Sequence, residues 1–147
     1  MKYSEVKQGR IFVIRLEDGE IVHEQIEKFA RDHSVNTAVL IMIGTADKGS
    51  RLVVGPEKER AMPVVILQHI LENVHEVAGT GTIFPDEQGN PIIHAHMSCG
   101  RETSTVTGCI RSGMKVWNVM EIILIELLES SAKRVLDSKA GLKFLEL

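Results

Sequence analysis

The stretch that most clearly decides the fold is VAGTGTIFPDEQGNPIIHAHMSCGR, residues 77–101. Two runs rich in β-branched and apolar residues flank PDEQGNP, residues 85–91, which is a dense cluster of turn formers. The glycines of GTGT, residues 79–82, are not followed by the Lys-Ser/Thr of a phosphate loop, so they indicate a strand that packs closely against a neighbour. TVTGCIRSG, residues 105–113, follows a second short turn. This part of the chain therefore predicts three successive antiparallel strands.

The segments around this stretch continue the β pattern and add one helix. The run TAVLIMIGTA, residues 37–46, is continuously apolar, which is typical of a strand buried on both faces. In residues 20–33, EIVHEQIEKFARDH, apolar residues recur at helical spacing and predict a helix that covers a sheet. LKFLEL, residues 142–147, fits a last edge strand. Further strands are predicted in residues 10–16, 51–55, 62–72 and 115–127.

Connections this short leave no room for repeated crossover helices. The predicted fold class is therefore α+β, with a curved, mostly antiparallel β-sheet of about seven strands and one main helix packed on it. A chain of 147 residues has the size of one ordinary domain, so residues 1–147 are expected to form a single domain.

Composition limits the expected binding partners of the protein and its expected location in the cell. The formal net charge of −3 gives DNA binding no support, because the overall field slightly repels phosphate. The most apolar late stretch, residues 119–128, is interrupted by Glu121 and Glu126 and is too short to span a bilayer. The beginning of the chain has no signal-peptide pattern, and two cysteines do not make a disulfide framework. We expect a cytoplasmic protein with no membrane segment.

Two histidines stand two positions apart in the strand IIHAHMSCG, residues 92–100. Alternate side chains of a strand share a face, so His94 and His96 should point together, away from Ala95 and Met97. Two imidazoles at this spacing can converge on one ion, but a tetrahedral zinc site needs at least a third ligand. Cys99 lies on the opposite face and is left out of this site.

Cys109 is the candidate third ligand, on an argument about register. If the hairpin turns at Glu102 and Thr103, Cys109 lies directly opposite His96, with Cβ atoms about 5 Å apart. A shift of one residue would turn Cys109 away. Two imidazoles and a thiolate suit zinc, and also nickel or iron, with one coordination position open. The alternative is that the histidines are hydrogen-bonded surface or subunit-facing residues and that Cys109 is a small buried filler.

The order of segments resembles the PPC domain family, which is named for plants and prokaryotes and is also called domain of unknown function 296. The resemblance rests on GRIFVIRLEDGE, on AVLIMIGTADKGSRLVVG, and above all on the G-x-G, turn, His-x-His and returning strand described above. It implies a homotrimer of α+β domains with a metal site. His94 and His96 match the first two histidines of that site, and Cys109 stands where many prokaryotic members have a third histidine.

Three functions follow as hypotheses. The first is a metal protein, with zinc as the expected cofactor and an unknown small molecule as the partner. The fold resembles that of acetolactate decarboxylase, which has a zinc site of three histidines, so a metal-dependent lyase or hydrolase is one option. The charged residues near the turns, Glu87, Arg101 and Glu102, would then either face the substrate or be ordinary surface charges. The second is a DNA-binding regulator, by family analogy, although the chain lacks the Arg-Gly-Arg-Pro segment of the plant members. Its scattered basic candidates are Lys48, Arg51, Lys58, Arg60, Lys115, Lys133 and Arg134. The third is a structural or interaction trimer without a ligand.

Overall fold

The computed structural model describes residues 1–111 and 113–147. Within these residues no helix is long and apolar enough to cross a membrane. The helices and strands are β1 (Lys7–Glu17), α1 (Val22–Asp32), β2 (Ala38–Ala46), β3 (Arg51–Pro56), β4 (Ile66–Ile70), β5 (His75–Pro85), β6 (Pro91–Arg101), β7 (Ser104–Cys109), β8 (Val116–Leu128), β9 (Lys133–Asp137) and β10 (Leu142–Glu146).

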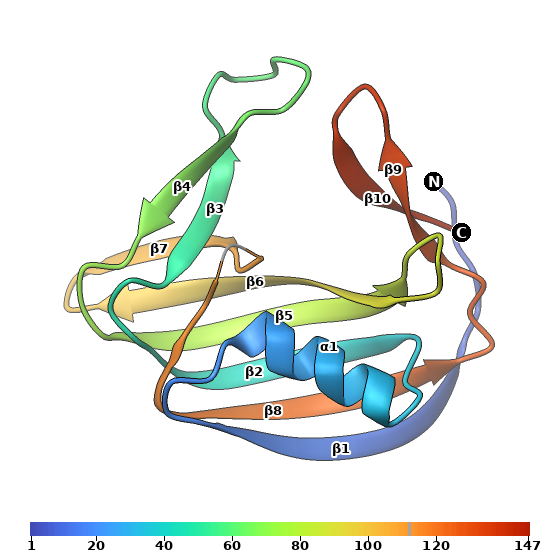
Figure 1. Cartoon of the computed structure of the whole chain (residues 1–147), viewed down its shortest axis with the longest axis horizontal. Coiled ribbons are helices and arrows are strands. Elements are labelled where there is room, and N and C mark those ends of the chain that lie inside the picture. The colour runs from blue at the N-terminus through green and yellow to red at the C-terminus, as the bar shows by residue number, and fades with distance from the viewer. Residues whose placement is uncertain (112) are drawn as a thin grey trace.

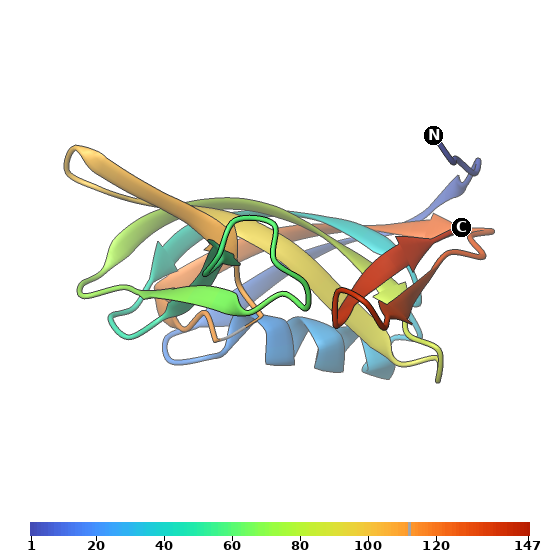
Figure 2. The same cartoon turned by 90° about the horizontal axis from the view of Figure 1, so that it is seen from above.

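The main sheet has eight strands in the order β1-β8-β2-β5-β6-β7-β3-β4, and all neighbouring pairs are antiparallel. Figure 1 shows α1 lying across the middle of this sheet, and Figure 2 shows that the helix covers one face while the strands bow over it. The predicted antiparallel sheet with one helix is therefore confirmed. The expected count of about seven strands is too low, because the main sheet alone has eight and a second sheet lies beside it.

The second sheet contains only β9 and β10, which form an antiparallel hairpin. The predicted strand over residues 142–147 exists, but it pairs with β9 and is not an edge of the main sheet. The sequence KRVLD of β9 is short and half polar, so it gives little strand signal. An isolated bridge between Asp86 and Arg134 ties the hairpin to the end of β5, and Lys143 forms an ion pair with Asp86 at 3.2 Å.

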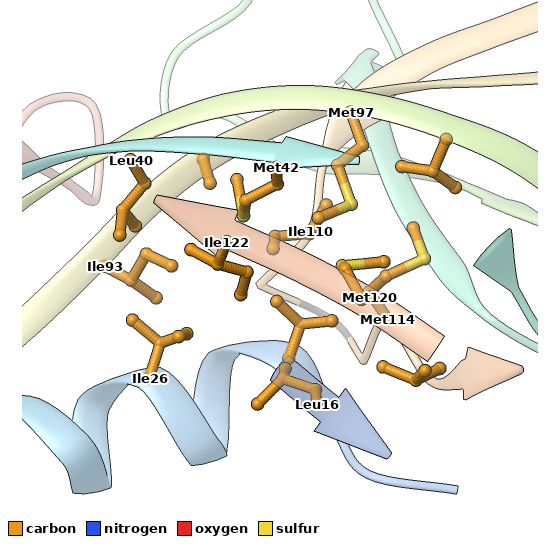
Figure 3. Close-up of a cluster of buried hydrophobic side chains, with 14 of the residues drawn as sticks. Leu16, Ile26, Leu40, Met42, Ile93, Met97, Ile110, Met114, Met120 and Ile122 are labelled. Atoms are coloured by element: carbon orange, nitrogen blue, oxygen red, sulfur yellow. The ribbon is translucent and has the colours of Figure 1, made fainter. Parts of the chain in front are cut away.

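The core lies between α1 and the face of the sheet that the helix covers. The helix buries Val22, Ile26 and Ala30, which repeat at helical spacing. Figure 3 shows Ile26 pointing toward Ile93 of β6 and the methionines clustering between the strands. Larger members of this core are Leu16, Leu40, Met42, Met97, Ile110, Met114, Met120 and Ile122.

The opposite face, which we call the outer face, is only partly covered. In β2, Leu40 and Met42 are fully buried, whereas Ile41 and Ile43 are 51% and 54% exposed. The expectation that residues 37–46 are buried on both faces is therefore wrong for the isolated chain. The physical reason is that α1 lies on one face only, so the described residues leave Ile41 and Ile43 largely uncovered on the other face.

Candidate metal centre

Strand β6 carries the two histidines on the outer face. Ile93, Ala95 and Met97 alternate with them and are buried in the core. His94 is half-buried and His96 is exposed. The predicted separation of the two sets of side chains is thus confirmed, and it follows from the two-residue period of a strand.

The β6–β7 hairpin turns in the register that the sequence argument required. Arg101 pairs with Ser104 across the turn, and His96 pairs with Cys109. Glu102 has a positive φ of 54°, which lets the chain reverse within two residues. Cys109 therefore lies beside His96 on the outer face, where it is 7% exposed.

A glycine lets β3 pass close to this end of β7. A Cβ atom on Gly108 would lie 2.6 Å from the carbonyl oxygen of Val53, a distance that side chains do not tolerate. Val53 is also the residue of β3 that pairs with Cys109. The glycine next to the candidate ligand is thus required by the crossing of β3, which forms one wall above the site.

The three candidate ligand atoms lie close together. The two Nε2 atoms of His94 and His96 are 3.2 Å apart, and the imidazole nitrogens and the Cys109 Sγ all lie within 4.8 Å of one another. Ligand atoms bound to one tetrahedral zinc are separated by roughly 3.3–3.6 Å. Small side-chain adjustments would therefore let one ion contact all three atoms. We call His94, His96 and Cys109 the HHC group.

The surroundings of the HHC group disfavour protonated imidazoles. Burial lowers the pKa of His94, and the positive charges of Arg134 and Arg111 lower it further. Burial likewise lowers the pKa of His96, together with His94 and Arg111. A neutral imidazole keeps the lone pair that a metal ion needs, so the donor set fits a divalent cation of the zinc type.

Arg134 of β9 is a neighbour of the site, whereas the sequence suggested it only as one of several scattered basic candidates for DNA binding. Arg134 is only 4% exposed. Its Nη2 donates a hydrogen bond of 2.8 Å to the hydroxyl of Thr82, which pairs with His94 across β5 and β6. Its guanidinium carbon lies 5.8 Å from the centre of the Phe84 ring. Nothing in the sequence marks this position, because the burial arises from the docking of the β9–β10 hairpin over β5.

A cavity of about 650 Å³ opens above the HHC group. Its walls come from β3, β4 and the loop between them on one side and from β10 on the other. Figure 1 shows the two hairpins, β3–β4 and β9–β10, rising on either side of β6 and β7. A metal ion on the HHC group would therefore have its remaining coordination position on the side of this cavity.

The other sequence candidates lie away from the HHC group. Cys99 is fully buried on the core face, as expected from strand parity, and burial raises the pKa of its thiol to about 11. Arg101 and Glu102 are exposed at the tip of the β6–β7 hairpin and line a different depression. Glu87 is exposed in the turn before β6. In the described residues these three charges therefore belong to the surface.

Fold and site together define a class: an antiparallel α+β protein with a compact histidine–cysteine group on the uncovered face of its sheet. The model of the Plants and Prokaryotes Conserved (PCC) domain family matches residues 3–128. The chain belongs to this family, and the resemblance seen in the sequence is confirmed. Arg134 and the β9–β10 hairpin lie beyond the matched residues. A comparison with curated proteins found no matching sequence.

Solved structures share the fold over nearly the whole chain. A plant- and prokaryote-conserved protein from Pyrococcus horikoshii is 26% identical, with a TM-score of 0.85 and coverage of 100% of this chain and 98% of that one. A metal-containing protein from Archaeoglobus fulgidus is 22% identical, with a TM-score of 0.84 and full coverage of both chains. A candidate DNA-binding protein from Ralstonia eutropha is 24% identical, with a TM-score of 0.73 and coverage of 92% and 90%.

Proposed function

We propose that this protein binds a divalent metal ion, zinc, through the HHC group. The observation that carries the proposal is the convergence of two imidazole nitrogens and a thiol within 4.8 Å on one face of the sheet. This is the arrangement of donors that a catalytic zinc site uses, with three protein ligands and one open position. The metal-containing protein from Archaeoglobus fulgidus, which has the same fold, supports the proposal.

The cavity favours chemistry on a small molecule over a purely structural role for the metal. Zinc at such a site supplies a Lewis acid for an oxygen of the bound molecule, which suits a lyase or a hydrolase. The protein's own contribution is the largely apolar cavity and the positive charge of Arg111, which lines it. These groups would orient the molecule and keep bulk water away from its reacting end.

The proposed assembly is a homotrimer formed through the outer face. Apolar side chains of β1, β2 and β8 lie uncovered there, with Val13 82% exposed beside Ile41, Ile43 and Ile123. Uncovered apolar patches of this kind mark contact surfaces. The number of subunits comes from the family resemblance, and the two free cysteines suit a reducing cytoplasm.

The outer face also links this patch to the metal site. One row of directly paired residues crosses six strands: Cys109, His96, Thr80, Ile41, Ile123 and Val13. A subunit that covers the apolar end of the row therefore lies on the same face as the HHC group at its other end. The trimer and the metal site would in this way share one surface of the sheet.

Duplex DNA is the weaker candidate partner. Two of the basic residues considered from the sequence are not free for phosphate, because Arg134 is buried and Lys115 forms an ion pair of 2.6 Å with Asp47. The net charge of −3 adds no attraction. A fluorescence titration with duplex DNA at two salt concentrations tests this alternative, and salt-sensitive binding at low salt would revive it.

Elemental analysis of protein purified without an affinity tag or added metal tests the metal proposal. The native protein should carry close to one zinc ion per chain, and His94→Ala and Cys109→Ala should lose it, with affinity reduced at least about ten-fold. Cys99→Ala is the matched control, because this second cysteine faces the core and should leave the metal content unchanged. Metal-free native protein, or unchanged metal in Cys109→Ala, would overturn the assignment.

A further inference from the structure

The cavity above the HHC group has largely apolar walls, and positive charges lie near the HHC group. We propose that it binds a small monocarboxylate with an apolar chain, with the carboxylate beside Arg111 and the HHC group and the chain between the two hairpins. The placement of the carboxylate next to the open coordination position rests on the proposed metal function. The charge and the walls of the cavity are independent of the metal.

The positive charge comes from two arginines, Arg111 and Arg134, whose side chains have no acidic partner among the residues that the structure describes. Arg111 lines the cavity, is exposed, and takes part in no ion pair with the described residues. Its charge acts on His94, His96 and Arg134 together, so it lies within electrostatic range of all three. Of the basic groups at the cavity, Lys143 is already paired with Asp86. Arg60 also lines the cavity, but it directly follows the acidic Glu59 in the chain, so Arg111 is the cation most available to a ligand beside the HHC group.

Arg134 strengthens the case because a buried guanidinium normally has a carboxylate partner. Here its one described hydrogen bond goes to the neutral hydroxyl of Thr82, and its buried Nε has no partner in the described structure. Burial and the nearby Arg111 both lower the pKa of Arg134. Two uncompensated guanidinium charges beside the same histidine leave a positive potential, and a bound anion would relieve their mutual repulsion.

The charge at this end of the cavity stays positive when the proposed metal is counted. A divalent ion and the Cys109 thiolate together add one positive charge to those of Arg111 and Arg134. In the described lining the acidic side chain is Glu59, which lies on the loop between β3 and β4 next to the oppositely charged Arg60. At that loop the charge of Glu59 opposes the charge of Arg60, so the HHC group is the part of the cavity that favours an anionic group.

The apolar walls of the cavity favour an apolar chain on the bound carboxylate. Val53, Val64 and Ile66 line one side of the cavity, and Leu142 and Phe144 of β10 line the other. A volume of about 650 Å³ is of the size that holds a small organic molecule and is far larger than an acetate ion needs. Burial of an apolar chain against these side chains would supply affinity that the carboxylate alone lacks.

Isothermal titration of the zinc-loaded protein with hexanoate tests this inference. Hexanoate should bind saturably. Hexanamide, which keeps the chain but loses the charge, and acetate, which keeps the charge but loses the chain, should each bind at least about ten-fold more weakly. Equal binding of hexanoate and hexanamide, or no hexanoate binding by protein that carries its metal, would overturn the inference.

Variants separate this inference from the metal proposal. Arg111→Gln should weaken hexanoate binding at least about ten-fold while its metal content stays that of the native protein. Arg31→Gln is the control, because Arg31 is an exposed arginine on α1, across the sheet from the cavity. Binding that depends on Arg111 in protein without metal supports the carboxylate site and contradicts only the metal role. Undiminished binding in Arg111→Gln, with melting temperature and metal unchanged, contradicts the carboxylate site alone.

Discussion

At the scale of single residues, Glu126 stabilises the irregular start of the β1–β8 pairing. The register shifts between Gln8 and Ile11, and the Glu126 carboxylate lies opposite this bulge. It accepts two hydrogen bonds of 2.7 Å from the Arg10 side chain and one of 3.1 Å from the Arg10 backbone. Gly9 leaves room for this side chain, since a Cβ there would lie 2.8 Å from a carboxylate oxygen. One buried acid thus satisfies the backbone that the bulge leaves without a strand partner.

This carboxylate predicts a contribution to acid sensitivity. The hydrogen bonds and charge of Arg10 lower the pKa of Glu126 below its ordinary value, although burial opposes the shift. The stabilisation is therefore complete above the ordinary glutamate pKa and is lost as the pH falls through the lower, folded-state pKa. Urea unfolding at a series of pH values between about 7 and 3 measures it.

Glu126→Gln should unfold at lower urea concentration than the native protein at pH 7, and the gap should shrink as the pH falls. The control is Glu129→Gln, which removes an exposed carboxylate three residues along the chain that pairs only at the surface with Lys7. If Glu126→Gln and Glu129→Gln gave the same curves at every pH, Glu126 would not have the stabilising role described here.

The positions of the candidate metal ligands could be predicted in part from the sequence. Strand parity and a two-residue turn were enough to place His94, His96 and Cys109 together, because both are local properties of a hairpin. The same reasoning could not find Arg134, whose position depends on a contact between segments 52 residues apart. Whether the HHC group holds a metal stays a prediction.

Among the strands, two glycines of β5 allow the neighbouring strand β6 to pack closely against it. A Cβ on Gly81 would lie 2.5 Å from the Cβ of Ala95, and one on Gly79 would lie 2.6 Å from the Met97 side chain. The interpretation of GTGT as a closely packed strand is thus confirmed. The two glycines allow β6 to lie close to β5. They thereby help to position His94 and His96, which lie on the other face of β6.

Gly81→Ala should destabilise the protein by about 1–3 kcal/mol, because overpacking a closed strand pair forces the backbones apart. Urea unfolding measures the change. Gly100→Ala is the control in the adjacent strand β6, where the added methyl would meet its nearest atom at an ordinary 3.5 Å. Equal stability of the two variants would show that the close approach at Gly81 has no energetic weight.

The strand β9 was not predicted from the sequence, for a physical reason. The antiparallel strands next to tight turns were predictable, because both periodicity and turn chemistry mark them. The strand β9 has neither a long apolar run nor a glycine or proline at its start, and it is stabilised by pairing with β10 and by contacts with β5. Tertiary contacts decide such short strands, so local pattern alone does not.

At the scale of the whole molecule, the apolar outer face predicts an oligomer. The run at residues 37–46 is apolar at consecutive positions, yet α1 covers only one side of the strand. A second copy of the chain on the outer face would bury Ile41 and Ile43 and so account for the sequence. The apolar pattern that misled the burial prediction for one chain is thus explained by the proposed assembly.

Sedimentation equilibrium checks this prediction. The native protein should sediment with the mass of three chains, and Ile43→Lys should sediment as smaller species, because a lysine in the patch would carry its charge into the buried contact surface. Val65→Lys is the control, since Val65 is equally exposed on the loop before β4, away from the patch. A native monomer, or a trimer that survives Ile43→Lys, would contradict a role for this face.

X-ray absorption spectroscopy of the zinc-loaded protein shows whether His94, His96 and Cys109 together bind one ion. The spectrum should show about one sulfur ligand near 2.3 Å and two or more nitrogen or oxygen ligands near 2.0–2.1 Å. In Cys109→Ala, loaded with excess zinc to offset its weaker affinity, the sulfur contribution should vanish, whereas it should persist in Cys99→Ala. A zinc ion with no sulfur neighbour in the native protein would show that Cys109 is not a ligand and that the HHC group does not bind the ion as proposed.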